Sequence, residues 1–129
     1  MSDFSNALKV TTTGLQAQAA RLRILSENIA NVDTPGYRRK TVSFEMEPTR
    51  SDVTGVKPGD VRLDRSELEV IHDPSHPLAD VTGNYLGSNV DLIIEIADAR
   101  EAQRSYEANL KMFDQTRQMS TSLMDLLRR

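Results

Sequence analysis

The sequence has 129 residues, 38% of them hydrophobic and 27% charged, with a net charge of −3. These values are ordinary for one small folding unit, and they give no reason to expect nucleic-acid binding. The absence of cysteine excludes disulfides and thiol chemistry. Aromatic residues make up only 5% and tryptophan is absent, so we expect apolar surface to be buried along helix stripes or against neighbouring molecules.

An apolar heptad predicts a helix from about Phe4 to Ile29. Thr11 and Gln18 interrupt its second apolar position, which weakens a dedicated two-stranded coil and favours packing against several neighbours. The residues of this helix that we assign to subunit contacts are Leu8, Leu15, Leu22, Leu25 and Ile29.

The helix is expected to stop in residues 26–39. Asn31 and Asp33 suit the end of a helix, and Pro35 followed by Gly36 suits the two central positions of a type II turn. Tyr37 leaves this turn as an aromatic side chain that can pack back on the helix. We therefore interpret residues 26–39 as the hinge between the helix and the middle of the chain.

The middle of the chain changes to a β pattern. Residues 41–47 alternate polar and apolar side chains, as a half-exposed strand does, and residues 51–59 are interpreted as a loop or hairpin connection. Val61 and Leu63, and then residues 68–71, give two more short strand candidates. From Asp73 to Asn89 we expect irregular structure up to the second helix.

A second helix is predicted from Asn89 or Asp91 to Arg128. Pairing with the first helix can cover only one of its two adjoining apolar stripes, so the other is expected to form an interface. One stripe comprises Leu92, Ile96, Ala99, Tyr106, Leu110, Phe113, Met124 and Leu127, and the other Ile93, Ala97, Ala108, Met112, Met119, Leu123 and Leu126.

These patterns predict a mainly α fold, in which two long terminal helices pair as a coiled-coil-like hairpin with a small β-rich middle insert and extended loops. The expected divisions are 1–37 for the first helix and turn, 38–89 for the β and loop region, and 90–129 for the second helix. Residues 1–6 lack the features of a secretory signal and the longest aliphatic cluster, at residues 92–94, is too short to span a bilayer. Work outside the cytoplasm would require a route without a cleaved signal.

The candidate chemical groups favour structural roles. His72 and His76 have the spacing of helical metal ligands, but Pro74 and Pro77 make a helix there unfavourable, and a loop surface is the better interpretation. The acidic series at 91, 95, 98 and 101 is interpreted as a solvated helix face, and residues 38–40, Arg-Arg-Lys, as a solvated or partner-facing surface. No nucleophile, phosphate-binding or dinucleotide motif is present, so we expect no enzyme, cofactor, metal or small-molecule substrate; an enzyme would need a pocket around His72 or His76.

The hinge carries a family resemblance. The run Ser-x-Asn-Ile-Ala-Asn-x-x-Thr-Pro-Gly-Tyr, at residues 26–37, resembles the amino-terminal signature of the axial proteins of the bacterial flagellum, which are rod, hook and hook-associated subunits. Residues 89–92, 100–110 and 123–128 are similar to the carboxy-terminal end of the C-type subunits of the proximal rod. The residues that match the hinge signature are Asn28, Asn31, Thr34, Pro35, Gly36 and Tyr37.

The resemblance implies a structural subunit that polymerises into a helical tube, transmits torque and forms an export channel. Implied partners are copies of itself, other rod subunits, the membrane-ring and export-gate side of the rod, the distal rod and the type III export apparatus. The implied location is the basal-body rod crossing the periplasm, reached without a cleaved signal. The alternative from the residues alone is a helical adaptor or export chaperone of a secretion system, which would be a defined small oligomer.

The contact residues expected on the second helix are Ile96, Tyr106, Leu110, Phe113, Met119, Leu123 and Leu127.

Overall fold

The computed structural model describes residues 2–48 and 53–128. The fold is mainly α, which confirms the predicted class. Two small antiparallel sheets are formed by the part of the sequence that connects the two long helices. The elements in chain order are α1 (Ser2–Ala30), β1 (Lys40–Pro48), β2 (Thr54–Leu63), β3 (Val70–His72), β4 (Asn84–Leu86) and α2 (Leu92–Leu127).

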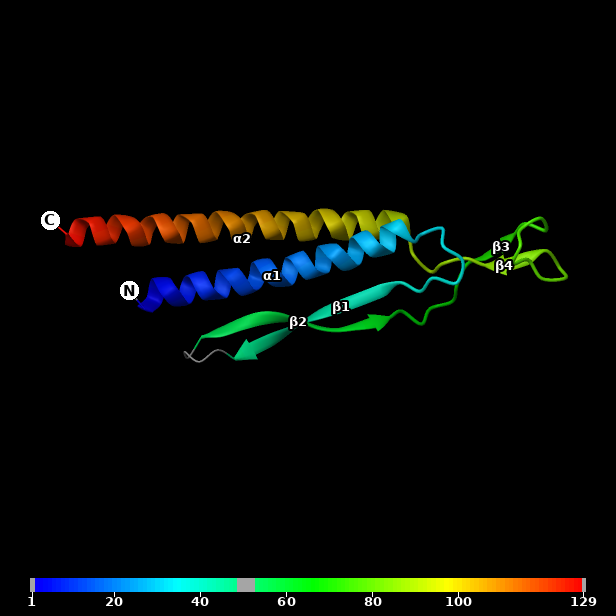
Figure 1. The fold of residues 1–129 in the computed structure, drawn as a ribbon, viewed down its shortest axis with the longest axis horizontal. Coiled ribbons are helices and arrows are strands. Elements are labelled where there is room, and N and C mark those ends of the chain that lie inside the picture. Colours follow the sequence, from blue (N-terminus) through cyan, green and yellow to red (C-terminus); the bar gives the residue numbers. More distant parts are fainter. Residues whose placement is uncertain (1, 49–52, 129) are drawn as a thin grey trace.

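The two helices lie side by side and antiparallel, so both ends of the chain are at the same end of an elongated molecule (Figure 1). The predicted bounds lie within two residues of those observed, except that the alternative start at Asn89 lies three residues before Leu92. Asp91 caps α2 as expected, because its side chain accepts hydrogen bonds from the backbone N–H groups of Ile93 at 3.1 Å and Ile94 at 3.4 Å.

The seam between α1 and α2 is made mostly of small and polar side chains. Among the described residues the buried apolar side chains are Ala17, Leu25 and Ala102. At Gly14 an added Cβ would lie 3.1 Å from the Asn109 amide nitrogen, so the helices approach closely there. The pairing therefore buries one large apolar side chain, Leu25, and leaves most apolar surface of the helices outside the seam.

Thr11 is buried in this seam, although the sequence pattern treated it as an interruption. Its hydroxyl donates to the carbonyl of Ala7 at 2.7 Å, which satisfies the polar atom within α1. Leu8, Leu15, Leu22 and Ile29, the regular apolar positions, are only half-buried. The expectation that pairing covers one apolar stripe of α2 holds only in part, because Ala99, Tyr106 and Phe113 are half-buried while the rest of that stripe is exposed.

Strands β1 and β2 form an antiparallel hairpin that packs along α1. The interpretation of residues 51–59 as a loop is wrong from Thr54 onward, and residues 51–52 lie outside the described part. The register passes from Val42↔Val61 to Phe44↔Pro58, so β2 carries one extra residue there. A bulge accommodates Pro58 and the glycine after it, the two residues that suggested a loop.

The hairpin is held against α1 at Gly55. A Cβ there would lie 2.9 Å from the hydroxyl oxygen of Thr13, and that hydroxyl accepts a hydrogen bond from the backbone N–H of Val56 at 3.1 Å. Only glycine allows this approach without movement of Thr13. The β1–β2 hairpin is thus fixed along α1 by backbone proximity.

Strands β3 and β4 form a second hairpin beyond the end of the helices where α1 stops and α2 starts (Figure 1). The sequence pattern predicted β3 but not β4, which lies in a stretch interpreted as irregular. Gly83 turns the chain with φ +83°, and hydrogen bonds from Thr82 lower the pKa of Asp80. The two strands pair over only three residues each, too few for a visible alternation.

Candidate assembly surface and its anchoring network

The hinge forms the turn that its sequence predicts. Gly36 has φ +75° and the backbone N–H of Tyr37 donates to the carbonyl of Thr34 at 3.2 Å, which is the pattern of a type II turn over residues 34–37. The Thr34 hydroxyl lies 3.0 Å from the Asn31 side-chain oxygen. Asn31 in turn donates to the carbonyl of Glu27 at 2.8 Å, so the last turn of α1 is tied to the hinge.

Replacing Gly36 by Ala is expected to weaken the hinge by about 1–2 kcal/mol, because a β-carbon disfavours positive φ. The check is swimming at raised temperature and the amount of the variant in purified basal bodies. Gly36→Asn is the matched control, since Asn tolerates this conformation, and it should stay close to the parent. Equal behaviour of Gly36→Ala and the parent would contradict the role of the turn.

Asn28 is the centre of the hinge network and is fully buried. Its side-chain oxygen accepts from the Tyr37 hydroxyl at 2.8 Å and from the Lys40 N–H at 2.9 Å. Its amide nitrogen donates to the Lys40 carbonyl at 2.8 Å and to the Glu95 carboxylate at 3.3 Å. One side chain of α1 therefore binds the turn, the start of β1 and the start of α2. Burial, with the nearby Glu27 carboxylate, raises the pKa of Tyr37, which keeps its hydroxyl a donor.

The basic run at 38–40 faces its own chain. The Arg39 guanidinium binds the buried Glu95 carboxylate and lies 3.5 Å from Asp98 and 3.8 Å from Asp64. The Lys40 ammonium lies 2.5 Å from Glu27. The interpretation of this run as a solvated or partner-facing surface is therefore wrong for Arg39, whereas Lys40 remains partly exposed in its ion pair with Glu27.

The prediction that Glu95 lies on a solvated acidic face is also wrong. Its side chain is fully buried, with 0% exposed. A buried carboxylate needs a paired charge and hydrogen-bond donors, and Arg39 and Asn28 supply both. Their positions are 56 and 67 residues from Glu95, so no local pattern could reveal them. The only feature of the sequence that could indicate burial of Glu95 is its position between Ile94 and Ile96 in an apolar run.

Asn89 closes the network from the other side. Its side-chain oxygen accepts from the Arg39 N–H at 2.6 Å, and its amide nitrogen donates to the Asp64 carbonyl at 2.9 Å. The hinge, both strands of the first hairpin and the entry to α2 thus meet at one polar cluster. The sequence indicates Asn89 as a helix-start residue and as part of the family match, but it does not indicate these contacts.

The residues expected to form subunit contacts differ in how far they are buried within this chain. Leu25 is buried in the seam, and Leu8, Leu15, Leu22 and Ile29 are half-buried. On α2, Tyr106 and Phe113 are half-buried. Ile96, Leu110, Met119, Leu123 and Leu127 are exposed, from 38% for Leu123 to 73% for Leu127.

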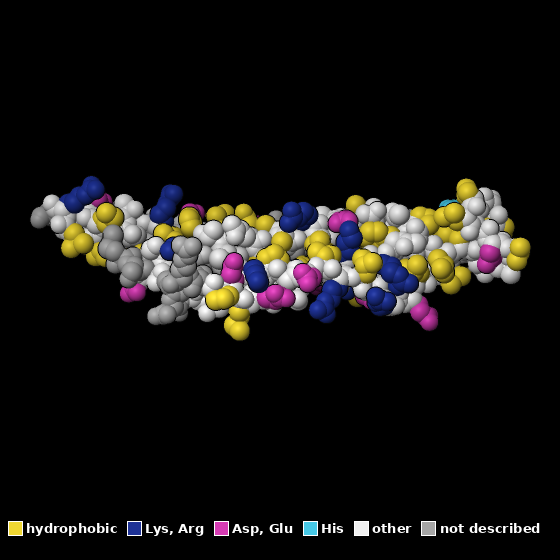
Figure 2. Space-filling view, turned by 60° about the horizontal axis from the view of Figure 1, so that its bottom comes forward, with side chains coloured by type: hydrophobic (Ala, Val, Ile, Leu, Met, Phe, Trp, Pro, Cys, Tyr) yellow, Lys and Arg dark blue, Asp and Glu magenta, His cyan; other side chains and the backbone are white. Residues whose placement is uncertain are grey.

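Exposed apolar side chains lie in two parts of the second helix, residues 92–96 and 110–127, and are together called the α2 surface. Its members are the large apolar side chains of α2 that remain exposed, and hydrophobic side chains are visible along the molecule in Figure 2. They are Leu92, Ile93, Ile94, Ile96, Leu110, Met112, Met119, Leu123, Met124, Leu126 and Leu127. Because exposed apolar surface is often an interaction site, the α2 surface is the candidate assembly surface.

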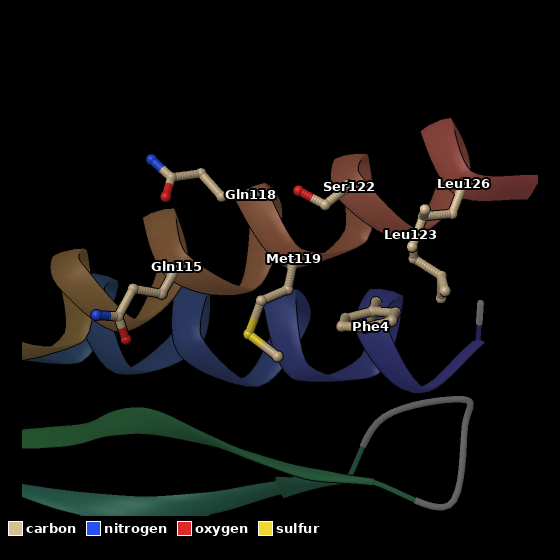
Figure 3. A pocket seen from close by; sticks show the side chains of 7 residues that line it. All are labelled: Phe4, Gln115, Gln118, Met119, Ser122, Leu123 and Leu126. Atoms are coloured by element: carbon tan, nitrogen blue, oxygen red, sulfur yellow. The ribbon is translucent and has the colours of Figure 1, made fainter.

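At the end of the helix pair the α2 surface meets α1 in a groove. Met119 and Leu123 extend from α2 towards α1 on either side of the Phe4 ring, while Gln118 and Ser122 point away (Figure 3). A second groove on α2 is lined by Ile93, Ile96, Ala97, Arg100, Glu101 and Arg104. Both grooves are open and largely apolar, a form that suits helix packing.

The two histidines lie in the β3–β4 hairpin. The His72 ring is 2.8 Å from the Asn84 side-chain oxygen, and His76 stacks on Tyr85 with ring centres 3.9 Å apart. Among residues 2–48 and 53–128 no group of three or more metal-ligand side chains is gathered. Within the same residues, neither helix combines the length and apolarity needed to cross a bilayer.

Comparison with known proteins identifies the family. Residues 8–38 match the family model described as flagella basal body rod protein, and residues 82–126 match that of the flagellar basal body rod FlgEFG protein C-terminal region. The chain is 46% identical to the flagellar basal-body rod protein FlgC of Agrobacterium fabrum, with 99% of this chain and 98% of the relative covered. It is 30% identical to the flagellar basal-body rod protein FlgC of Salmonella typhimurium, with 94% of this chain and 96% of the relative covered.

The FlgC protein of Bacillus subtilis is 29% identical over the same shares of both chains. The two family matches contain the hinge signature and most of α2, the segments on which the resemblance to rod subunits rested. The structural role replaces the enzyme and the adaptor as interpretations. The chain belongs to the FlgC family of flagellar basal-body rod proteins, and is a structural subunit of the rod rather than an enzyme.

Proposed function

We propose that this subunit builds the proximal part of the rod, where it packs with copies of itself and other rod subunits into a helical tube that transmits torque and encloses an export channel. The observation that carries the proposal is the contrast between the seam and the α2 surface. The seam buries Leu25 as its one large apolar side chain among the described residues, while the apolar side chains of the α2 surface remain exposed.

The energetics favour burial of this surface between subunits. Burying a Leu, Ile or Met side chain gains about 1.5–3 kcal/mol. The free energy gained by burying several such side chains can exceed the entropy lost on association. α1 leaves these side chains exposed, so their burial requires neighbouring molecules. A subunit of this kind is stabilised by its neighbours.

The mode of contact that we propose is helix packing of the coiled-coil type. The α2 surface and the half-buried α1 positions Leu8, Leu15, Leu22 and Ile29 would meet helices of adjacent subunits. In this arrangement segments 1–37 and 90–129 form the inner helical layer, and segment 38–89 lies outside it. Met1, Arg129 and residues 49–52 of these segments lie outside the described residues.

The hinge residues Asn28, Asn31, Thr34, Pro35, Gly36 and Tyr37 set the angle between the two layers in this proposal. The hydrogen bonds of Asn28 to the turn and to β1 support it.

Further partners come with a place in the proximal rod. The membrane ring and export gate would lie at one end of the subunit layer and the distal rod at the other, and the type III export apparatus would deliver the chain across the inner membrane into the periplasm. The proposed route leaves the amino terminus intact. Mass spectrometry of the chain from basal bodies should then find no loss of an amino-terminal segment, and a shortened chain would contradict the route.

The test of the function is fractionation. A tagged chain should restore swimming to a strain that lacks its own copy and should co-purify with flagellar basal bodies. Recovery as a defined small oligomer in the cytoplasm, absent from basal bodies, would instead support the adaptor or chaperone. The tagged Leu110→Met variant is a suitable control, because it keeps an apolar side chain of similar volume at the proposed contact.

A further inference from the structure

The seam between α1 and α2 contains little that would fix how far one helix is shifted along the other. On α2, residues seven apart occupy the same line against α1, and their side chains are small or polar: Ala102 is buried and Asn109 and Thr116 are half-buried. Gly14 faces Asn109 from α1. Sliding by one heptad would exchange these α2 side chains for one another, so apart from the close approach at Gly14 the small side chains of the seam specify the register weakly.

One layer of the seam differs from the others. Glu95 occupies the same line, seven residues before Ala102, and is completely buried. Its carboxylate binds the guanidinium of Arg39 and accepts a hydrogen bond from Asn28 at 3.3 Å. A shift by one heptad that pairs Gly14 with Thr116 would place Ala102 opposite Asn28 and leave Glu95 without these partners, and a buried unpaired carboxylate is strongly unfavourable. The opposite shift would bring Glu95 to Arg21, which lies seven residues before Asn28 and pairs with Glu101 at 3.7 Å in the structure, and would separate Glu95 from Asn28 and Arg39.

We propose that Glu95, held by Asn28 and Arg39, is the residue that determines the axial register of the two helices. A buried charge with specific partners can serve this purpose, because it disfavours the alternative registers more than it stabilises the chosen one. Arg39 directly precedes β1, so the same contact determines where the β1–β2 hairpin leaves the helix pair.

The register has a consequence for the surface. Phe4 of α1 lines one groove with Met119 and Leu123 of α2, so this groove exists only in the observed register. A role for this groove in subunit contact rests on the proposed function, whereas the assignment of the register to Glu95 does not. The two are separable by experiment, since intramolecular cross-links report the register and basal-body content reports assembly.

The absence of cysteine from the sequence makes the test direct. The pair Gly14→Cys with Asn109→Cys reports the observed register, because a Cβ at position 14 would lie 3.1 Å from the Asn109 side chain. The pairs Gly14→Cys with Ala102→Cys or with Thr116→Cys report a shift by one heptad in either direction. The two pairs that report a shift also carry Asn109→Ala, which gives room for the cysteine side chain at position 14. Each pair is made in the full chain and oxidised in whichever cell fraction contains it, and the intramolecular disulfide is measured by mass spectrometry.

With Glu95 present, the observed pair should form almost alone. Glu95→Leu should keep the helices paired but raise the ratio of the Gly14–Thr116 cross-link to the observed one by about tenfold or more, because that register no longer buries an unpaired carboxylate. The Gly14–Ala102 cross-link should rise less, since Glu95 would meet Arg21 in that register. Glu95→Gln keeps oxygen and nitrogen atoms for Asn28 and Arg39 and should retain most of the observed pair. Glu107→Leu, at an exposed position of the same helix, should change nothing.

Two outcomes would overturn the proposal. Unchanged preference for the observed pair in Glu95→Leu would show that other contacts fix the register. A uniform loss of all three cross-links would show that Glu95 only stabilises the pair. Normal cross-linking preferences in a chain that never enters basal bodies would refute the proposed function and leave the register assignment intact.

Discussion

Replacing Leu110 by Asp is expected to block incorporation of the subunit into the rod and to abolish swimming, while the chain is still made. Leu110 is 42% exposed on α2, so its substitution disturbs the isolated subunit little. In an assembled tube it would put an unpaired carboxylate into an apolar contact, which costs several kcal/mol. The measurements are swimming in soft agar and the amount of variant in purified basal bodies.

Leu110→Met is the matched control for this prediction and should swim nearly as well as the parent. Leu110→Asn separates polarity from charge and should be intermediate. Normal swimming of Leu110→Asp would remove Leu110 from the proposed interface. Phe113→Asp is also expected to block assembly, but Phe113 is half-buried in the subunit itself, so its loss reports folding and assembly together.

The isolated subunit is expected to contain much less helix at low concentration than α1 and α2 together contain in the structure. Helices gain most of their stability from packing, and α1 with α2 buries few apolar side chains: Ala17, Leu25 and Ala102 among the described residues. Thr11, Thr12, Thr13 and Gly14 further lower the helix propensity of α1. Circular dichroism of the purified chain, compared with the assembled form, measures the difference.

Concentration dependence is the control for this second prediction. The helical signal should rise as the chain associates, because neighbours cover the α2 surface. Two fully formed helices that unfold cooperatively at low concentration would contradict the view that neighbours supply the missing packing.

The sequence was sufficient for the features that depend on local chemistry. Heptad spacing and the Asp91 cap gave the helices, and Pro35 with Gly36 gave the type II turn. These features depend on backbone preferences and on side chains a few residues apart. The hinge signature and the second match in α2 then gave the family, which the comparisons confirmed.

Features that depend on distant partners were not predictable in the same way. Pro58 and Gly59 locally favour a loop. Their place in a bulged strand depends on pairing with β1 around Val42 and Phe44, which no local pattern contains. Glu95 was assigned to solvent because Arg39 and Asn28 reach it from far along the chain. In each case tertiary pairing reversed a local preference, and a single sequence holds no record of such pairs.

The arrangement of the chain also gives the subunit a built-in polarity. Both termini lie at one end of the molecule and the fully exposed Val81 lies in the hairpin at the other, with a helix of 36 residues, about 54 Å, between. Small labels at Val81 and at the carboxy terminus would therefore mark opposite poles of every copy. Imaged in basal bodies, they would give the direction in which the subunit points relative to the cell body.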